Sequence, residues 1–201
     1  MRGALNIIVR GMPSVIKVGG IPYEAHTGFR VGIECERILD DPELRDNEAH
    51  AMVIAQHFDG MTTPPPGNEL WAAVSEFHAA SEFALFDALK ASRMPSSQGR
   101  GRTFDWDYDA HLVIADFQRE YGIDLTDPSL EMHWWRFMDL FRGLSDASRT
   151  RGVMAERGAK VPDKAPAEVR RSIETARQAA ALPPRTEGEA IEQEKERYGI
   201  G

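Results

Sequence analysis

Residues 130–144, LEMHWWRFMDLFRGL, constrain the fold of this chain more than any other segment. Five large apolar side chains recur there at helical spacing and form one stripe: Leu130, Trp134, Phe137, Phe141 and Leu144. With Trp135 and Met138 beside the stripe, the helix is apolar over more than half of its circumference, so it is either a central core helix or presents a face to a partner. We assign Trp134 and Phe137 to the core. Trp135, Met138 and Phe141 are candidate partner contacts, with a core position as the alternative for each.

The remaining sequence predicts a mainly α, single-domain fold with a small N-terminal β-hairpin. Residues 15–18 and 21–25 favour strands, and Gly19-Gly20 suits a two-residue turn with positive φ. Pro22 lacks an amide hydrogen, which places its strand at an edge. Thr27 is then expected to cap a helix that runs to Leu39.

Further helices are predicted at residues 46–58, 68–91, 107–120 and 130–144, followed by a short helix that Ser145 caps. Gly122 is the expected C-terminal stop of the helix over 107–120. Trp106, just before that helix, and Phe117, within it, are assigned to the core. We expect a helical domain over residues 1–158, interrupted by a flexible connector at 92–103.

The extension over residues 159–201 has few large apolar side chains. Two helical pieces, 166–181 and 187–198, are separated by Pro183-Pro184 and could not build a core alone. We therefore expect a C-terminal tail that is either helical or disordered, and that folds on a partner or stays mobile.

Bulk properties exclude several classes of protein. With 42% hydrophobic and 28% charged residues in 201, the chain is typical of a soluble globular protein. No apolar run reaches the roughly 18 residues of a membrane span, and the net charge of −8 argues against nucleic-acid binding. The single Cys35 cannot form an internal disulfide. We expect neither a membrane nor a nucleic acid as partner.

The carboxylates of residues 105–116 resemble the outline of a calcium loop. Asp105, Asp107 and Asp109 alternate, and Asp116 falls eleven residues after the first. Ala110 stands where the loop requires glycine, Asp116 replaces a bidentate glutamate, and the segment after Asp109 is strongly helical. We therefore expect these aspartates to begin a helix and complement its dipole rather than to bind calcium.

No other motif indicates a metal or catalytic site. His50 and His57 are too far apart on one helix to chelate a metal as a pair, and His111 and His133 lack a second ligand at zinc spacing. No local pattern gives Cys35 a partner ligand. The chain contains neither a nucleophile elbow nor a phosphate-binding loop. We expect no cofactor, no metal and no enzymatic activity.

Two segments together resemble the Gp-fifteen family of bacteriophage proteins. FDWDYDAHLVIADFQREYGIDL, from Phe104, and MHWWRFMDLFRGLSD, from Met132, match that family's acidic-aromatic opening, its YGIDL helix end, its histidine with two tryptophans and its GLSD close. Met132 replaces the family's leucine before the histidine. Near the N-terminus four further positions fit the family's opening: Tyr23, Thr27, Phe29 and Arg30. The resemblance covers roughly residues 12–157.

The resemblance implies a siphophage tail assembly chaperone without catalytic residues. Such a protein would act in the host cell cytoplasm, bind the tape measure protein, help to recruit tail tube subunits, and leave before the tail is complete. Self-association and contact with the tail tube protein are further expectations. Two alternatives remain open: a structural tail component that stays in the virion, and a metal-dependent enzyme that uses Asp105, Asp107, Asp109 and Asp116.

Overall fold

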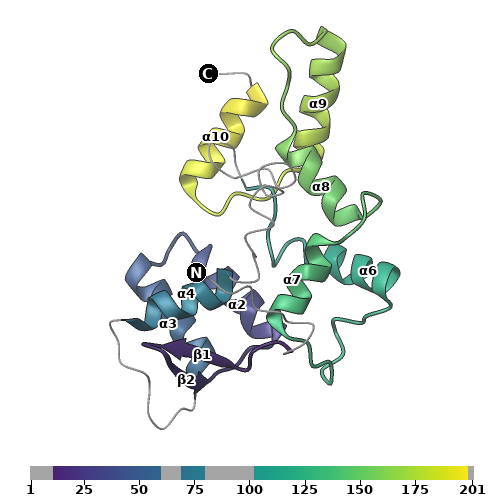
Figure 1. Cartoon of the computed structure of the whole chain (residues 1–201). Helices are drawn as coiled ribbons and strands as arrows, with labels where there is room; N and C mark the ends of the chain where they lie inside the picture. The colour runs from purple at the N-terminus through teal and green to yellow at the C-terminus, as the bar shows by residue number, and fades with distance from the viewer. Residues whose placement is uncertain (1–10, 60–68, 80–101, 199–201) are drawn as a thin grey trace. The chain divides into compact units, whose positions relative to one another are not determined.

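A computed structural model describes residues 11–59, 69–79 and 102–198 of the chain. It is mainly helical with a two-stranded hairpin near the N-terminus (Figure 1), so the predicted mainly α class with a small N-terminal hairpin is confirmed. The chain packs as two compact units. The first unit comprises residues 1–84 and 131–142, and the second comprises residues 85–130 and 143–201. Among the helices of the described residues, none is both long and apolar enough to span a bilayer.

The hairpin of the first unit has the predicted strands and turn. Strands β1 (Val15–Val18) and β2 (Ile21–Glu24) pair antiparallel, with Val15 opposite Glu24 and Val18 opposite Ile21. Gly19 and Gly20 have φ angles of +57° and +82°, which glycine adopts without the steric cost of a Cβ. Ile16 and Val18 are buried while Lys17 between them is exposed, so β1 turns one face to the core.

Four helices complete the described part of the first unit: α2 (Phe29–Leu39), α3 (Asp46–Phe58), α4 (Leu70–Ala79) and α7 (Trp134–Arg142). The bounds of α3 are those predicted. The remainder of the helix predicted at 68–91, and all of the connector at 92–103 except residues 102 and 103, lie outside the described residues.

A short antiparallel pairing sets the beginnings of α2 and α7. Gly28 forms an isolated β-bridge with His133. The amide of Phe29 donates to the carbonyl of Met132 at 2.8 Å, and the amide of Trp134 donates to the carbonyl of Thr27 at 2.8 Å. The predicted Thr27 side-chain cap is therefore wrong: Gly28 is the N-cap, and it makes no side-chain cap hydrogen bond. The same pairing delays α7 to Trp134, whereas the apolar pattern predicted a start near residue 130.

The core of the first unit is built on the contact between α2 and α7. The indole of Trp134 lies so close to Gly32 that a Cβ there would be 2.1 Å from Cε3 of the indole. Phe29 and Phe137 stack at 5.3 Å between ring centroids. Trp134 and Phe137 are both fully buried, as predicted. Only glycine at position 32 permits this approach of the two helices.

The second unit contains α6 (Ala110–Tyr121), α8 (Arg149–Gly158), α9 (Ala167–Ala180) and α10 (Glu187–Tyr198). Gly122, at φ +67°, ends α6 as predicted. The predicted cap of α8 is wrong, because the side chain of Ser148 rather than that of Ser145 accepts the amide of Arg151. Ser145 instead donates from its amide and hydroxyl to Glu120, at 2.8 and 2.9 Å.

Candidate functional site

The buried aspartates that precede and enter α6 are bound by arginines and backbone amides of the second unit. Asp105 pairs with Arg185 at 2.7 Å and with Arg102. Its Oδ1 also accepts the backbone amides of Asp107 and Tyr108, both at 2.9 Å. The side chain of Asp105 therefore closes the turn before α6 and joins this turn to the chain around Arg185, whereas the expected aspartate cap of α6 itself is absent, because the N-cap residue Asp109 makes no side-chain cap hydrogen bond.

Asp109 forms a buried two-pronged ion pair with Arg157 of α8. The two N–O distances are 2.6 and 2.9 Å, and the side chains of Arg157 and Asp109 are only 5% and 2% exposed. Arg157 also donates to the carbonyls of Ala180 and Thr103, at 2.6 and 3.0 Å. One guanidinium thus ties together the segment before α6, helix α8 and the C-terminal end of α9.

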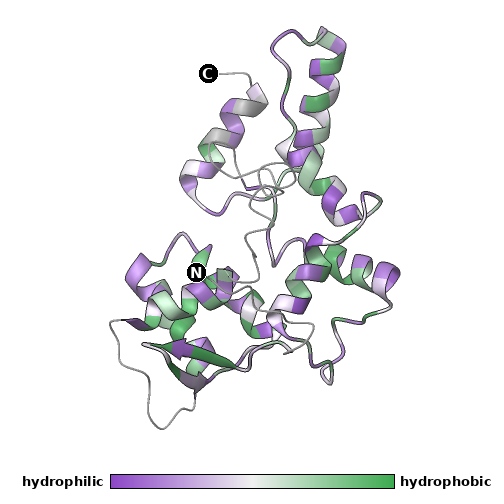
Figure 2. Cartoon of the chain, viewed as in Figure 1, coloured by the Kyte–Doolittle hydropathy of each residue, from purple (hydrophilic) through white to green (hydrophobic). Residues whose placement is uncertain are grey.

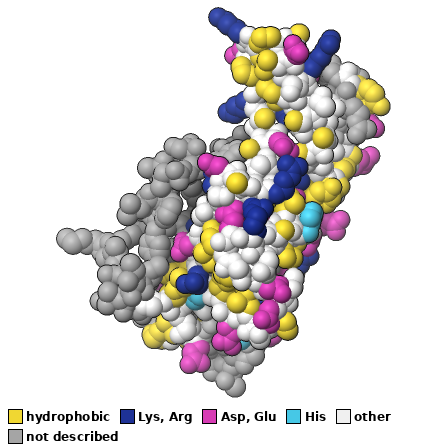
Figure 3. Space-filling model, turned by 90° about the vertical axis from the view of Figure 1, so that its right-hand side faces the viewer, with side chains coloured by type: hydrophobic (Ala, Val, Ile, Leu, Met, Phe, Trp, Pro, Cys, Tyr) yellow, Lys and Arg dark blue, Asp and Glu magenta, His cyan; other side chains and the backbone are white. Residues whose placement is uncertain are grey.

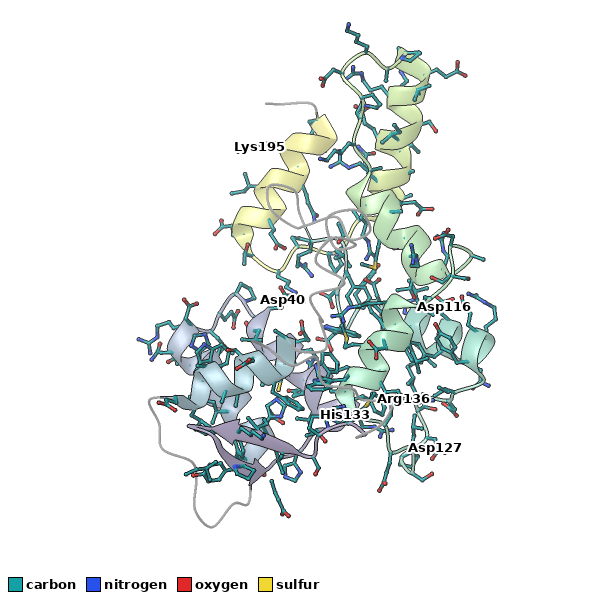
Figure 4. The ribbon with its side chains drawn as sticks, in the orientation of Figure 1. Asp40, Asp116, Asp127, His133, Arg136 and Lys195 are labelled. Carbon is teal, nitrogen blue, oxygen red and sulfur yellow. The ribbon has the colours of Figure 1, made fainter. Side chains whose placement is uncertain are left out.

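Asp116 caps α8 from the neighbouring helix α6. Its carboxylate is fully buried and accepts the amides of Thr150 at 2.8 Å and Arg149 at 3.2 Å, at the N-terminus of α8. Arg119 lies one turn further along α6, and its guanidinium nitrogen is 2.6 Å from Oδ1 of Asp116. Burial alone would raise the pKa of Asp116, but the hydrogen bonds from Thr150 and Arg149 and the charge of Arg119 outweigh it and lower the pKa. Asp116 is labelled in Figure 4.

These contacts give the aspartates separate structural partners. Within the described residues they do not form a group whose oxygen atoms could surround one ion. Asp107 is exposed, whereas Asp105, Asp109 and Asp116 are buried. The aspartate pattern in the sequence therefore reflects the internal ion pairs and caps of the second unit.

We expect the Asp116→Asn variant to lose stability at neutral pH and to approach the wild type in acid. A carboxylate whose pKa is lower when folded than when unfolded stabilises the protein above its ordinary pKa of 3.8, and this contribution is lost as the pH falls through the folded pKa. Urea unfolding from pH 7 down to pH 3 measures the difference, with the exposed Asp163→Asn as surface control. A difference that stays constant with pH would contradict the assignment.

A cavity of about 460 Å³ lies where α6, α8 and the end of α9 meet. Tyr108 at its edge is 50% exposed, and the guanidinium of Arg157 lies 5.9 Å from the centre of the tyrosine ring. The lining combines apolar and charged side chains and includes Leu112, Val153, Glu156 and Ala180. Such a cavity can accept an apolar side chain whose neighbours are polar.

Helix α9 continues from this cavity as an incompletely covered amphipathic helix. None of its side chains is buried. Val169, Ile173, Ala176 and Ala180 recur at helical spacing, and Val169 is 45% exposed. Figure 2 shows hydrophobic and hydrophilic residues alternating along α9, and Figure 3 shows hydrophobic side chains gathered at the upper end of the displayed face. We call Tyr108, Val169, Ile173, Ala176 and Ala180 the α9 surface.

Two of the three predicted partner contacts are core side chains in the first unit. Trp135 is 4% exposed, and its indole nitrogen donates to the carbonyl of Phe77 at 2.9 Å. Phe141 is 7% exposed and stacks with Phe137. Both side chains therefore occupy core positions, which was the alternative given for each of them. Met138 is half-buried, so its role as a contact stays a prediction.

Of the four residues that we assigned to the core, three are buried and one is not. Phe117, Trp134 and Phe137 are at most 1% exposed. Trp106 is only half-buried, and its ring meets the ring of Phe104 edge-on at 4.8 Å. Helical periodicity predicted the first three. Trp106 precedes α6, where that periodicity does not apply.

A second cluster, in the first unit, has no local signal in the sequence. Cys35 of α2, His57 of α3 and His78 of α4 each offer one donor atom, and the three atoms lie within 4.8 Å of one another. All three residues are buried. Its members are more than 20 residues apart along the chain and meet only when the helices pack, so the sequence did not predict the cluster.

Comparison with known proteins identifies a family for this chain. A family model described as "Bacteriophage Gp15 protein" matches residues 10–182, which include the hairpin, α2 to α9, the buried aspartates and the Cys35 cluster. The match extends over more of the chain than the resemblance seen in the sequence, and it includes α9. No curated protein and no solved structure matches the chain.

Proposed function

Because the chain belongs to the bacteriophage Gp15 protein family, we propose that it is a non-enzymatic tail assembly chaperone that binds the tape measure protein in the host cytoplasm. Membership in the family indicates a phage structural or assembly-related protein. The chaperone role, the recruitment of tail tube subunits and the siphophage context are the further steps of this proposal.

The observation that supports it best is the α9 surface. Ile173 and Ala180 are only half covered, and Val169 is exposed at the other end of the stripe. The C-terminal end of the helix is held by Arg157, which donates to the carbonyl of Ala180. An anchored helix whose apolar stripe is only partly covered suits pairing with a second amphipathic helix, which is the expected form of tape measure segments.

The cavity beside Tyr108 adds a place for an anchoring side chain. Aromatic residues next to a recess commonly dominate the affinity of protein interfaces. Tyr108 and Ala180 belong both to the α9 surface and to the cavity lining, so one apolar partner side chain could contact the ring and enter the recess. Charged residues at the rim, such as Arg149 and Glu156, would then set the orientation of the partner.

We expect Val169→Asp and Tyr108→Asp to weaken capture of the tape measure protein of the same phage by about tenfold each, because an anchoring side chain contributes on the order of 1–2 kcal/mol. The measurement is a quantitative pull-down after co-expression with the full-length chain. Met52→Asp is the matched control, because Met52 is exposed to a similar degree, 43% against 45% for Val169, but lies on α3 of the first unit.

Two outcomes would contradict parts of the proposal. If all three variants capture the tape measure protein equally well, the α9 surface is not the binding site. If the wild type captures none, the tape measure protein is not the partner. Mass spectrometry of purified phage particles tests whether the protein leaves before the tail is complete. A copy number that matches the rings of the tail tube would instead identify a structural component of the virion.

A further inference from the structure

The cluster of Cys35, His57 and His78 has distances close to those of a zinc site. The Sγ of Cys35 lies 3.7 Å from Nε2 of His57. In a tetrahedral site with Zn–S of about 2.3 Å and Zn–N of about 2.0–2.1 Å, the sulfur and nitrogen ligands are about 3.5 Å apart. The third donor atom, from His78, lies within 4.8 Å of both. An inward shift of about 1 Å would complete three of the four bonds.

Hydrogen bonds outside the cluster set the tautomers of both histidines. Nδ1 of His57 lies 2.8 Å from the carbonyl oxygen of His26. A carbonyl only accepts, so Nδ1 carries the proton and Nε2, which faces Cys35, is the basic nitrogen. Nε2 of His78 lies 2.7 Å from the Glu36 carboxylate, which makes Nδ1 the basic nitrogen of that ring. Metal-binding histidines characteristically donate their second nitrogen to a carbonyl or a carboxylate in this way.

The surroundings suit a structural cation. The side chains of Cys35 and His57 are at most 1% exposed, and the ring of His78 stacks on Trp134 at 4.9 Å. The burial that lowers the pKa of His57 to about 4 keeps its imidazole neutral and able to bind a metal. Burial also raises the pKa of the Cys35 thiol, so a cation would have to displace its proton.

We propose that Cys35, His57 and His78 bind one zinc ion in the first unit, with water as the fourth ligand. On binding, the thiol of Cys35 loses its proton to solvent and the thiolate bonds to the metal, while the two imidazoles bind as neutral ligands. The ion cross-links α2, α3 and α4, which no disulfide can do in a chain with one cysteine. The proposal concerns the stability of the first unit and is independent of the α9 surface.

Cobalt(II) titration of the full-length protein, purified without metal, tests the site. We expect one Co²⁺ per chain, a thiolate-to-cobalt charge-transfer band, the visible bands of a tetrahedral centre, and their loss on addition of zinc. Zinc should also raise the midpoint of thermal unfolding of the wild type.

Three variants assign the ligands. Cys35→Ser should abolish the charge-transfer band, and His78→Gln should weaken cobalt binding at least tenfold. His50→Ala should leave both unchanged, because His50 also lies on α3 but stacks on Trp71 outside the cluster. A wild type without a charge-transfer band would overturn the proposal, even if the ligand variants do not fold. A band that survives in Cys35→Ser would overturn it equally.

Discussion

Replacing Gly32 by alanine is expected to lower the free energy of unfolding by about 3 kcal/mol, at the upper end of the range for overpacked cores. The added Cβ would lie 2.1 and 2.2 Å from two carbon atoms of the Trp134 indole. This ring cannot move aside easily, because it is 1% exposed and lies between His78 and Phe137, with stacked centroids at 4.9 and 5.8 Å.

Gly152→Ala is the matched control for this prediction. Gly152 also lies in a helix, but a Cβ there would meet only the end of the flexible Arg149 side chain, at 4.0 Å. Alanine should therefore stabilise α8 by about 0.5–1 kcal/mol. Urea unfolding followed by circular dichroism measures both variants. A loss below 1 kcal/mol for Gly32→Ala would show that α2 and α7 do not pack as closely as described.

The second large effect is expected for Arg157→Met, which should cost the second unit about 3–5 kcal/mol. The change leaves the carboxylate of Asp109 buried without its counter-charge, and it removes the donor to the carbonyls of Thr103 and Ala180. A buried charge without a partner is far more costly than an absent pair.

The Asp109→Asn/Arg157→Met double variant should therefore be more stable than Arg157→Met alone. Its recovery in a double-mutant cycle measures the coupling between the two side chains. Arg149→Met is the surface control. Its pair with Glu156, at 3.4 Å, joins side chains that are 61% and 37% exposed, so the expected cost is below about 1 kcal/mol. If Arg149→Met and Arg157→Met lowered the free energy of unfolding equally, burial of the Arg157–Asp109 pair would not determine its contribution to stability.

Features set by neighbouring residues could be predicted from the sequence. The Gly19-Gly20 turn, the bounds of α3 and the stop at Gly122 all depend on backbone preferences within a few positions. Predictions of helix starts and caps were wrong where contacts with a distant segment determine the local structure. The start of α7 depends on the pairing of Gly28 with His133, and no local pattern at residue 130 contains that information.

The same distinction applies to the candidate sites. Periodicity placed Trp135 on a helix beside the core stripe but could not decide its exposure, which depends on Phe77 of α4. The aspartate pattern does lead into a helix, since Asp109 is the N-cap residue of α6, but the expected side-chain cap is wrong because Asp109 makes no cap hydrogen bond. The arginine partners of the aspartates, Arg157 and Arg185, come from segments about 50 and 80 residues further on, so the ion pairs were not predictable. Val169 did lie in a segment for which a binding role was expected.

The first unit is assembled from two separated stretches of chain, and this affects its synthesis on the ribosome. The hairpin and α2 to α4 are translated by residue 79, but Trp134 and Phe137, which pack against α2, come about 55 residues later. At roughly 5–20 residues per second, several seconds pass before they are made. Throughout that interval the apolar face of the nascent N-terminal part lacks its cover. A protein proposed to shield another chain thus needs its own later residues before its first unit can close.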